Sequence, residues 1–267
     1  RDQARFSEAS RLIQQALAIL EQHAQSRPGM LARAVLCSAN IQHDLGQFQA
    51  SAAGFRRALD MYKKIYPAGH KEVAFAYNGL GIALHELSHN DEALEAYEKA
   101  LAMREKFVGK DSSDVASTLN NMANVYHDQG NYAQAETLLR RVVAIAEKEV
   151  LADPDGNSSA RKRLAESLVN LSNPLEELTK YSEAETALRR ALALYEALPS
   201  PDPLGKSLAY NNLSTLCMTL GRYLECRTYQ EQSHALKESV LSGDHPELAK
   251  SLQNLGAAIS MQGDAEG

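Results

Sequence analysis

The feature that most constrains this chain is a repeat of about 42 residues that runs through its whole length. Small or turn-forming residues mark the repeat at Gly46, Ser88, Gly130, Thr179, Gly221 and Gly263. Every interval between them is 42 residues except one of 49. A period in this range is typical of stacked helical hairpins, each of which buries its apolar face only against its neighbours. The markers predict the turns between the two helices of each hairpin.

An apolar stripe with helical spacing precedes each turn. Before Gly130 the stripe is Leu119, Met122, Ala123 and Tyr126, which share one face at about 100° per residue. Its third position is small in every repeat, so that the second helix can approach closely: Ala39, Gly81, Ala123, Ser172, Ser214 and Gly256. The pattern predicts that the large residues of the stripe, Leu119, Leu168 and Leu213, are buried between the first and second helices.

We therefore expect an all-α fold, a right-handed superhelical solenoid of antiparallel helix hairpins with about six repeats, as a single domain over residues 1–267. The expected divisions are a partial hairpin at 1–27, hairpins at about 28–69, 70–111, 112–152, 160–200 and 203–243, and a partial hairpin at 244–267. The seven extra residues of the long interval predict a surface loop at about 152–159. Pro174 lies inside the next first helix and is expected to leave that helix bent or shortened, ending near Leu178.

Segments 72–109 and 114–145 resemble tetratricopeptide repeats, and the 42-residue period and the Leu-Asn-Asn phrase are similar to the kinesin light chain subtype. The resemblance extends over essentially the whole chain. It implies an array whose first helices line a concave surface, and in kinesin light chain-like repeats a row of asparagines on that surface is implicated in binding cargo peptides. Such repeats serve many unrelated scaffolds, so the ligand must be argued from this chain's own residues.

Composition limits the classes of partner and compartment. The net charge of −6 and pI near 5.8 argue against a nucleic-acid partner, which requires a clustered basic face. The arginine pairs at 56–57, 140–141 and 189–190 share one offset on the second helix and are expected on a solvated outer face. No stretch approaches the ~20 apolar residues of a membrane span. Cys217 and Cys226 occupy core offsets and are expected to be small buried hydrophobes, which suits a cytoplasmic protein.

No enzyme constellation is present in the sequence: it contains no glycine-rich phosphate loop, paired metal-ligand motif or nucleophile elbow. We therefore expect no catalytic residue, cofactor or metal. His43, His85 and His127 recur at one offset, each followed by an acid. Hairpins stack roughly 10 Å apart, whereas the histidine nitrogens around zinc lie at ~2 Å from the metal. The histidines are therefore assigned to the flank of a groove.

Polar residues recur on the side of the first helix opposite the apolar stripe. The candidate groove residues are amides or acids: Asn40, Glu86, Asn121, Asn124, Asp128, Asn170, Asn173, Glu177, Asn212 and Asn254. An amide offers two donors and an acceptor, so a row of amides can pair with the backbone of an extended peptide whatever its sequence. Two alternatives remain open: asparagine recurs because the repeats duplicated, or because it bonds between neighbouring helices.

The charge of this surface favours one kind of ligand. On this surface one offset is acidic in each of the first four repeats, and the surface becomes more apolar toward Leu208, Met218 and Met261. We therefore predict a protein–protein interaction scaffold that binds an extended basic or neutral peptide. The alternatives are a regulatory or sensor segment of a larger signalling protein that makes intramolecular contacts, and a module that self-associates through its terminal hairpins.

Overall fold

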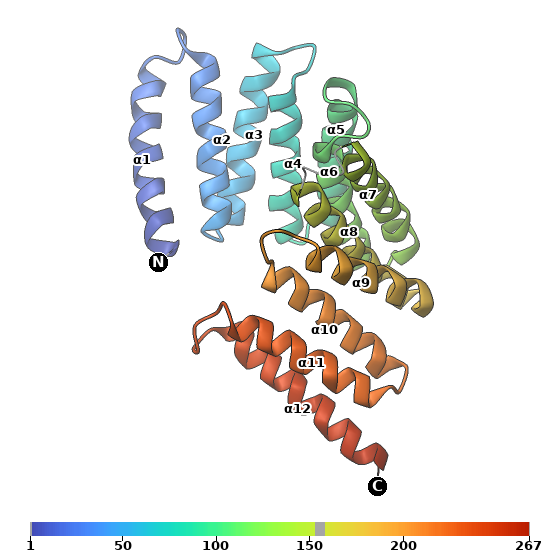
Figure 1. The fold of residues 1–267 in the computed structure, drawn as a ribbon. Helices are drawn as coiled ribbons and strands as arrows, with labels where there is room; N and C mark the ends of the chain where they lie inside the picture. Colours follow the sequence, from blue (N-terminus) through green and yellow to red (C-terminus); the bar gives the residue numbers. More distant parts are fainter. Residues whose placement is uncertain (1, 153–157, 267) are drawn as a thin grey trace. The chain divides into compact units, whose positions relative to one another are not determined.

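The computed structural model describes residues 2–152 and 158–266, and every regular element within these ranges is an α-helix (Figure 1). The helices are α1 (Asp2–Gln22), α2 (Pro28–Asp44), α3 (Phe48–Ile65), α4 (Lys71–Glu86), α5 (Asn90–Phe107), α6 (Ser113–Asp128), α7 (Tyr132–Ala152), α8 (Ser158–Glu177), α9 (Tyr181–Glu196), α10 (Pro203–Thr219), α11 (Tyr223–Glu238) and α12 (Pro246–Glu266). The predicted all-α fold of consecutive helix hairpins is confirmed. None of the described helices is both long and apolar enough to cross a membrane.

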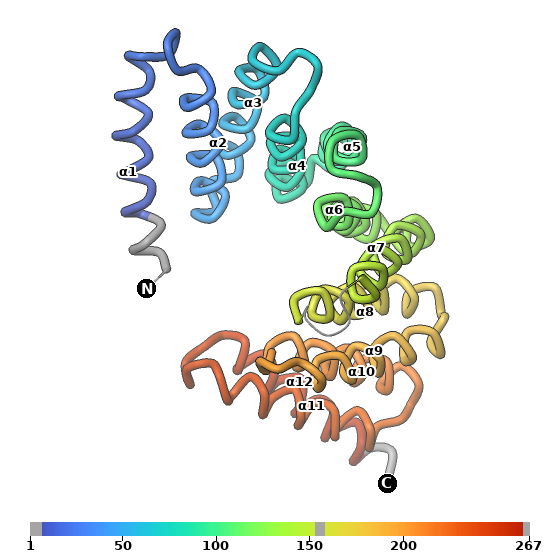
Figure 2. The backbone as a smooth tube through the Cα atoms, turned by 45° about the horizontal axis from the view of Figure 1, so that its top comes forward, coloured from blue at the N-terminus to red at the C-terminus, as the bar shows by residue number. Residues whose placement is uncertain are grey.

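The helices form two compact units, Arg1–Gln129 (unit 1) and Gly130–Gly267 (unit 2). Within each unit every helix packs against the next one along the chain, as the backbone trace shows (Figure 2). First helices also contact first helices, α2 with α4 and α4 with α6 in unit 1, and α8 with α10 in unit 2. The expected hairpin at 112–152 contributes α6 to unit 1 and α7 to unit 2. A single continuous domain over 1–267 stays a prediction.

The predicted core register is confirmed. Leu119, Leu168 and Leu213 are 0%, 3% and 0% exposed. The small position of the stripe serves close packing, since a Cβ added to Gly81 would lie 2.5 Å from a ring carbon of buried Tyr97. In this hairpin α4 therefore meets α5 at the residue that the repeat keeps small.

The turns between paired helices are left-handed at the predicted markers. The φ angles of Gly46, Ser88, Gly130, Thr179 and Gly221 lie between 59° and 73°. Each turn residue follows the last turn of a helix. After Gly46, Ser88, Thr179 and Gly221 the next backbone amide donates a hydrogen bond back to that helix, as Lys180 N does to Leu175 O at 2.8 Å. The turn expected at Gly263 is wrong: α12 continues to Glu266.

From the backbone conformation of Thr179 we expect that replacing this residue by glycine stabilises the protein. Thr179 is β-branched and adopts a φ of 59°, a conformation that costs a side-chain-bearing residue about 1–2 kcal/mol. Thr179→Gly should raise the stability of unit 2 by roughly 0.5–1 kcal/mol, after the extra freedom of glycine in the unfolded chain is counted. Chemical denaturation measures the change. The matched control Gly221→Thr, at φ 72°, should lose stability; a loss in Thr179→Gly would contradict the argument.

Two expectations concern the fourth hairpin. The loop predicted at about 152–159 falls mostly on residues 153–157, which lie outside the described residues; Ala152 and Ser158, at its two ends, belong to helices. Part of the insertion therefore lengthens α7 and α8, to 21 and 20 residues. The helix α8 passes through buried Pro174 and ends at Glu177, next to the expected end near Leu178 and at the repeat equivalent of the end of α6, so it is not shortened. Burial of the flanking Leu171 and Leu175 outweighs the poor helix propensity of proline. The bend expected at Pro174 stays a prediction.

The arginine pairs of the second helices bridge neighbouring repeats. Arg57 reaches back from α3 to Glu21 of α1 at 2.7 Å, while Arg56 reaches forward to Glu92 of α5 at 3.0 Å. The expected solvated outer face is thus also a network of ion pairs between second helices. Because these side chains are about half exposed, each pair contributes only about 0.2–1 kcal/mol.

The cysteines behave as predicted. Cys217 and Cys226 are buried, and Ser214 Oγ lies 3.1 Å from the sulfur of Cys226. Burial raises the pKa of the Cys217 thiol to about 11, so it stays protonated at neutral pH. All three cysteines are free, including exposed Cys37.

Candidate peptide-binding surface

The predicted surface residues of unit 1 lie on the last turns of its first helices. Each unit has a surface formed by its first helices, α2, α4 and α6 in unit 1 and α8, α10 and α12 in unit 2, and we call this surface the first-helix face of the unit. In unit 1 none of the predicted side chains is buried: Asn40, His43, His85, Glu86, Asn121, Asn124, His127 and Asp128 are half-buried or exposed. They are therefore accessible to a ligand.

Unit 2 presents the second part of the predicted set. Asn173 and Glu177 are exposed on α8, and Asn170 is half-buried beside them. Asn212 on α10 and Asn254 on α12 are also half-buried. The amides at the shared offset are thus half-buried, whereas the acids Glu86, Asp128 and Glu177, which we call the acidic rim, are exposed.

Hydrogen bonds between asparagine side chains link neighbouring first helices. Asn121 Nδ2 donates to Asn78 Oδ1 across 3.5 Å from α6 to α4. Asn254 Nδ2 donates to Asn211 Oδ1 across 3.2 Å from α12 to α10, and Asn212 Nδ2 donates to Asn173 Oδ1 across 2.9 Å from α10 to α8. These bonds support the second alternative that the sequence left open, in which asparagine joins adjacent helices.

Asn78 and Asn211 were not among the predicted residues, although Asn211 immediately precedes predicted Asn212 and Asn78 has the same repeat offset as Asn211. Their oxygens each receive a second donor from the second helix: Arg104 Nη1 reaches Asn78 Oδ1 at 3.4 Å, and Gln230 Nε2 reaches Asn211 Oδ1 at 3.4 Å. Both amides are therefore oriented from beneath the surface. Asn121 and Asn254 donate an N–H to these two oxygens, so the Oδ1 atoms of Asn121 and Asn254 take no part in these hydrogen bonds.

Arg104 is a deeply buried support, with 5% of its surface exposed. Its guanidinium also donates to Asp114 O at 2.5 Å and to Thr118 Oγ1 at 2.6 Å. Burial lowers the pKa of the Arg104 guanidinium, because the charged form loses hydration. Neutral oxygens of α4 and α6 replace that hydration, so the arginine joins α5 to the two first helices beneath the amides.

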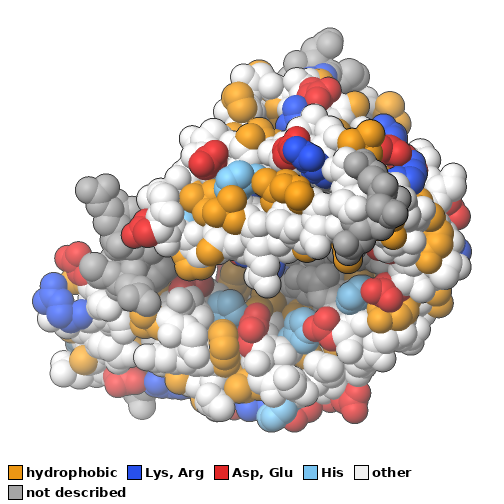
Figure 3. Space-filling model, turned by 90° about the horizontal axis from the view of Figure 1, so that it is seen from below, with side chains coloured by type: hydrophobic (Ala, Val, Ile, Leu, Met, Phe, Trp, Pro, Cys, Tyr) orange, Lys and Arg blue, Asp and Glu red, His pale blue; other side chains and the backbone are white. Residues whose placement is uncertain are grey.

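The histidine row forms one direct link between repeats. His85 Nε2 lies 2.8 Å from Asp128 Oδ2, which joins α4 to α6. His43 instead lies 3.6 Å from its own neighbour Asp44 and packs against Phe48. Histidine and acidic side chains can be seen next to each other on the surface drawn in Figure 3. Within residues 2–152 and 158–266, no group of three or more His, Cys, Asp or Glu side chains has a metal-binding arrangement.

A second carboxylate lies beside predicted Glu177. Glu176 is half-buried, and its Oε1 accepts a hydrogen bond from Thr219 Oγ1 at 3.2 Å. Burial raises the pKa of the Glu176 carboxyl, and the nearby Glu177 raises it further, while the bond from Thr219 lowers it. This link between α8 and α10 occupies the place that His85–Asp128 occupies between α4 and α6, and the sequence analysis did not identify it.

The far end of unit 2 is more apolar, as predicted. Leu208, Met218 and Met261 are exposed. A cavity of about 370 Å³ between α10 and α12 is lined by Leu204 and Leu208 together with Asn211, Lys250 and Asn254, among others. The amide row of unit 2 thus ends beside a pocket of a size that small apolar groups occupy.

Comparison with known proteins identifies the family. The tetratricopeptide repeat model matches residues 31–106, 90–148, 114–197 and 205–266, and the chain therefore belongs to the tetratricopeptide repeat family. This family is generally a non-enzymatic scaffold for protein–protein interaction. No curated protein sequence matches the chain.

Solved structures share the fold at low sequence identity. BtubC (BKLC) from P. vanneervenii is 22% identical with a TM-score of 0.71, over 91% of this chain and 93% of that one. The nearly identical repeats of a putative kinesin light chain from Podosopora anserina are 20% identical with a TM-score of 0.61, over 79% and 97%. The apo form of RapI is 13% identical with a TM-score of 0.64, over 98% and 70%. The expected similarity to kinesin light chain-like repeats is confirmed at the level of the fold.

Proposed function

We propose that this chain is a non-enzymatic scaffold that binds an extended basic or neutral peptide segment on its first-helix face. The observation that carries the proposal is the row of accessible amides, oriented by bonds between adjacent first helices, with acids along its rim. The amide positions are Asn40, Asn121, Asn124, Asn170, Asn173, Asn212 and Asn254.

The chemistry of the row favours N–H donors. The bonds between helices use the N–H groups of Asn121, Asn212 and Asn254, so their carbonyl oxygens can accept bonds from a peptide backbone. The rim adds the carboxylates Glu86 and Glu177, which favour a lysine or arginine side chain over an acidic one. His43, His85 and His127 flank this surface in unit 1.

A peptide-array screen that varies charge at constant length identifies a ligand, and two sets of variants then test where it binds. Asn170→Ala with Asn212→Ala should weaken binding about tenfold, as expected when two neutral hydrogen bonds of about 0.5–1.5 kcal/mol each are lost. Glu86→Lys with Asp128→Lys should shift the preference toward acidic peptides and reverse the salt dependence. Isothermal titration calorimetry measures both effects.

The control is Glu231→Gln, an exposed change on α11 away from the first-helix face, which should leave the affinity unchanged. Circular dichroism verifies that every variant is folded. A ligand that binds equally well to both sets of variants would place its site elsewhere on the molecule.

Self-association is the alternative that a specific observation favours. Leu12 and Ile19 on α1, and Leu252 and Ile259 on α12, are large apolar side chains that are 45–62% exposed. Light scattering coupled to size exclusion distinguishes a self-associating module from a monomeric peptide binder. The other alternative, an intramolecular regulatory contact, would appear as weaker peptide binding by any longer protein that contains these repeats than by the repeats alone. We place the chain in the cytoplasm because its three cysteines are free thiols.

A further inference from the structure

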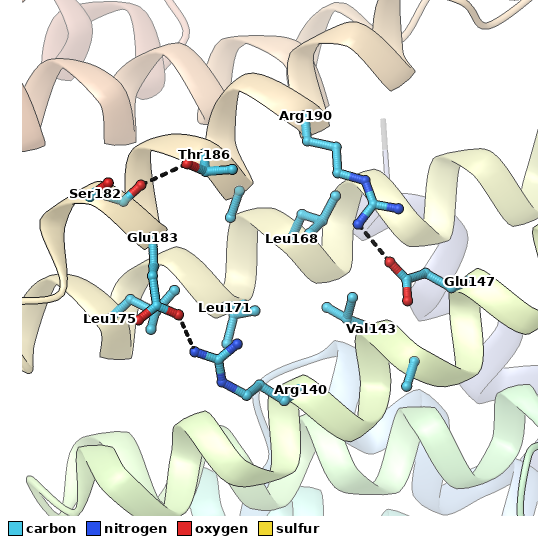
Figure 4. Close-up of a pocket in the computed structure, with 12 residues that line it drawn as sticks. Arg140, Val143, Glu147, Leu168, Leu171, Leu175, Ser182, Glu183, Thr186 and Arg190 are labelled. Carbon is cyan, nitrogen blue, oxygen red and sulfur yellow. Dashed lines mark hydrogen bonds and ion pairs between the residues drawn. The ribbon is translucent and has the colours of Figure 1, made fainter.

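A slot opens on the second-helix side of unit 2, opposite the first-helix face. It lies between α7 and α9 above α8, has a volume of about 430 Å³, and its floor is formed by Leu168, Leu171 and Leu175 (Figure 4). Arg190 Nη1 and Glu147 Oε1, 2.6 Å apart, bridge α9 and α7 on one side of these leucines. A second ion pair, Arg140–Glu183, bridges the same helices on the other side.

An aromatic ring occupies the equivalent place in unit 1. The repeat equivalent of Leu168 is Tyr77 on α4, 91 residues earlier. Lys63 Nζ on α3 lies 5.2 Å from the centre of the Tyr77 ring, and Lys99 Nζ on α5 lies 5.8 Å from it. Lys63 and Lys99 are the repeat equivalents of Glu147 and Arg190, which line the slot. The Tyr77 ring therefore lies where the slot lies in unit 2.

The next junction of unit 2 is also filled by rings. Tyr210 on α10 is the equivalent of Leu168, and its ring stacks on that of Tyr229 on α11 with centres 5.9 Å apart. Tyr229 is itself the equivalent of Ala187, another residue of the slot. At the two equivalent positions, the α9–α11 junction therefore has tyrosines and the α7–α9 junction has a leucine and an alanine.

The junction between α1 and α3 follows the same rule. Its residue at this offset is Val35, and a cavity of about 230 Å³ lies there, lined by Val35, Glu21 and Arg57 among others. Among these four junctions, a ring fills the two that have tyrosine at this offset, and a cavity lies in that place in the two that have valine or leucine. The α1–α3 cavity is the more polar of the two, with Gln14 and Gln42 in its wall.

We propose that the slot between α7 and α9 receives a tyrosine side chain from a protein partner. The leucine floor suits the ring, which gains from burying its large apolar surface. The charges complement a phenol: the Arg190 guanidinium is placed to face the ring as Lys99 faces Tyr77, and the Glu147 carboxylate can accept a bond from the hydroxyl group. The partner completes, from outside, the packing that Tyr77 and Tyr210 provide within the chain.

Methyl NMR of the full chain tests this with p-cresol, toluene and the tripeptide acetyl-Gly-Tyr-Gly-amide as probes. All three should shift the methyl signals of Leu168, Leu171 and Leu175, and p-cresol should bind more tightly than toluene because of its hydroxyl group. Absence of shifts at these methyls would overturn the proposal. Binding of p-cresol without binding of the tripeptide would also overturn it, since a peptide-borne tyrosine could not then enter.

Matched variants make the test specific. Leu168→Tyr fills the slot from within and should reduce tripeptide binding at least tenfold; Ala187→Tyr, which copies the tyrosine at position 229, serves if the first variant does not fold. Tyr77→Leu should create a new site in unit 1, seen as probe-induced shifts at Leu80 and Leu84. Binding that survives both filled variants would contradict the proposal. Asn170→Ala with Asn212→Ala should leave probe binding unchanged, which separates this site from the first-helix face.

Discussion

Truncating Leu213 to alanine is expected to destabilise unit 2 by about 2–5 kcal/mol, the range for removing a buried leucine and leaving a cavity. Leu213 is 0% exposed between α10 and its neighbours. Because stability in a repeat array is close to a sum of neighbour terms, the loss should be greatest in the hairpins next to α10. Guanidinium denaturation followed by circular dichroism gives the overall change, and hydrogen exchange shows where the helices open.

The control for this experiment is Leu224→Ala. Leu224 lies on the neighbouring helix α11 and is 67% exposed, so its truncation should change stability by less than about 0.5 kcal/mol. Equal losses in the two variants would show that the apolar stripe does not carry the stability of the unit. A uniform increase in hydrogen exchange across unit 2 would show that its hairpins unfold as one.

The second prediction with a large expected effect on stability concerns two glycines at the same repeat offset. Gly81→Val should destabilise unit 1 by about 3 kcal/mol, because the new side chain begins 2.5 Å from the ring of Tyr97, which is 1% exposed and cannot move aside. Gly256 has the same offset, but no atom of the described residues lies within 4 Å of an added Cβ there. Gly256→Val should therefore change stability by a few tenths of a kcal/mol at most.

Thermal and chemical denaturation of the two valine variants measure this difference. The comparison holds the substitution and the repeat position constant and varies only the packing. If Gly256→Val were as destabilising as Gly81→Val, the loss would come from the backbone and not from the contact with Tyr97.

The repeat pattern was sufficient to predict most of the fold. Hairpin positions, the burial of Leu119 and Leu168, and the left-handed turns follow from local sequence, because each repeat packs mainly against its immediate neighbours. The same small position recurs wherever a second helix must approach. Helical periodicity, turn chemistry and core pattern therefore all indicate one structure, and no long-range contact has to be guessed.

The exceptions show what local sequence could not predict. Pro174 was expected to leave its helix bent or shortened, yet α8 runs on to Glu177, because the neighbouring Leu171 and Leu175 are buried in the contacts with α7 and α9. For this proline the surroundings of the residue, not its intrinsic preference, decide where the helix ends. Gly263 has the residue type of a turn but lies within α12.

For the candidate site, too, some features followed from the sequence and others only from the tertiary structure. Sequence alone determined which residues are polar at the exposed offset, because helical periodicity assigns each residue to a face. Only the tertiary structure decided that Asn121 bonds to Asn78 and Asn254 to Asn211, that Arg104 lies beneath the first pair, and that Leu168 leaves a slot where Tyr77 fills one. Hydrogen bonds and cavities depend on distances of a few tenths of an ångström between different helices, and such distances are set by how whole repeats pack.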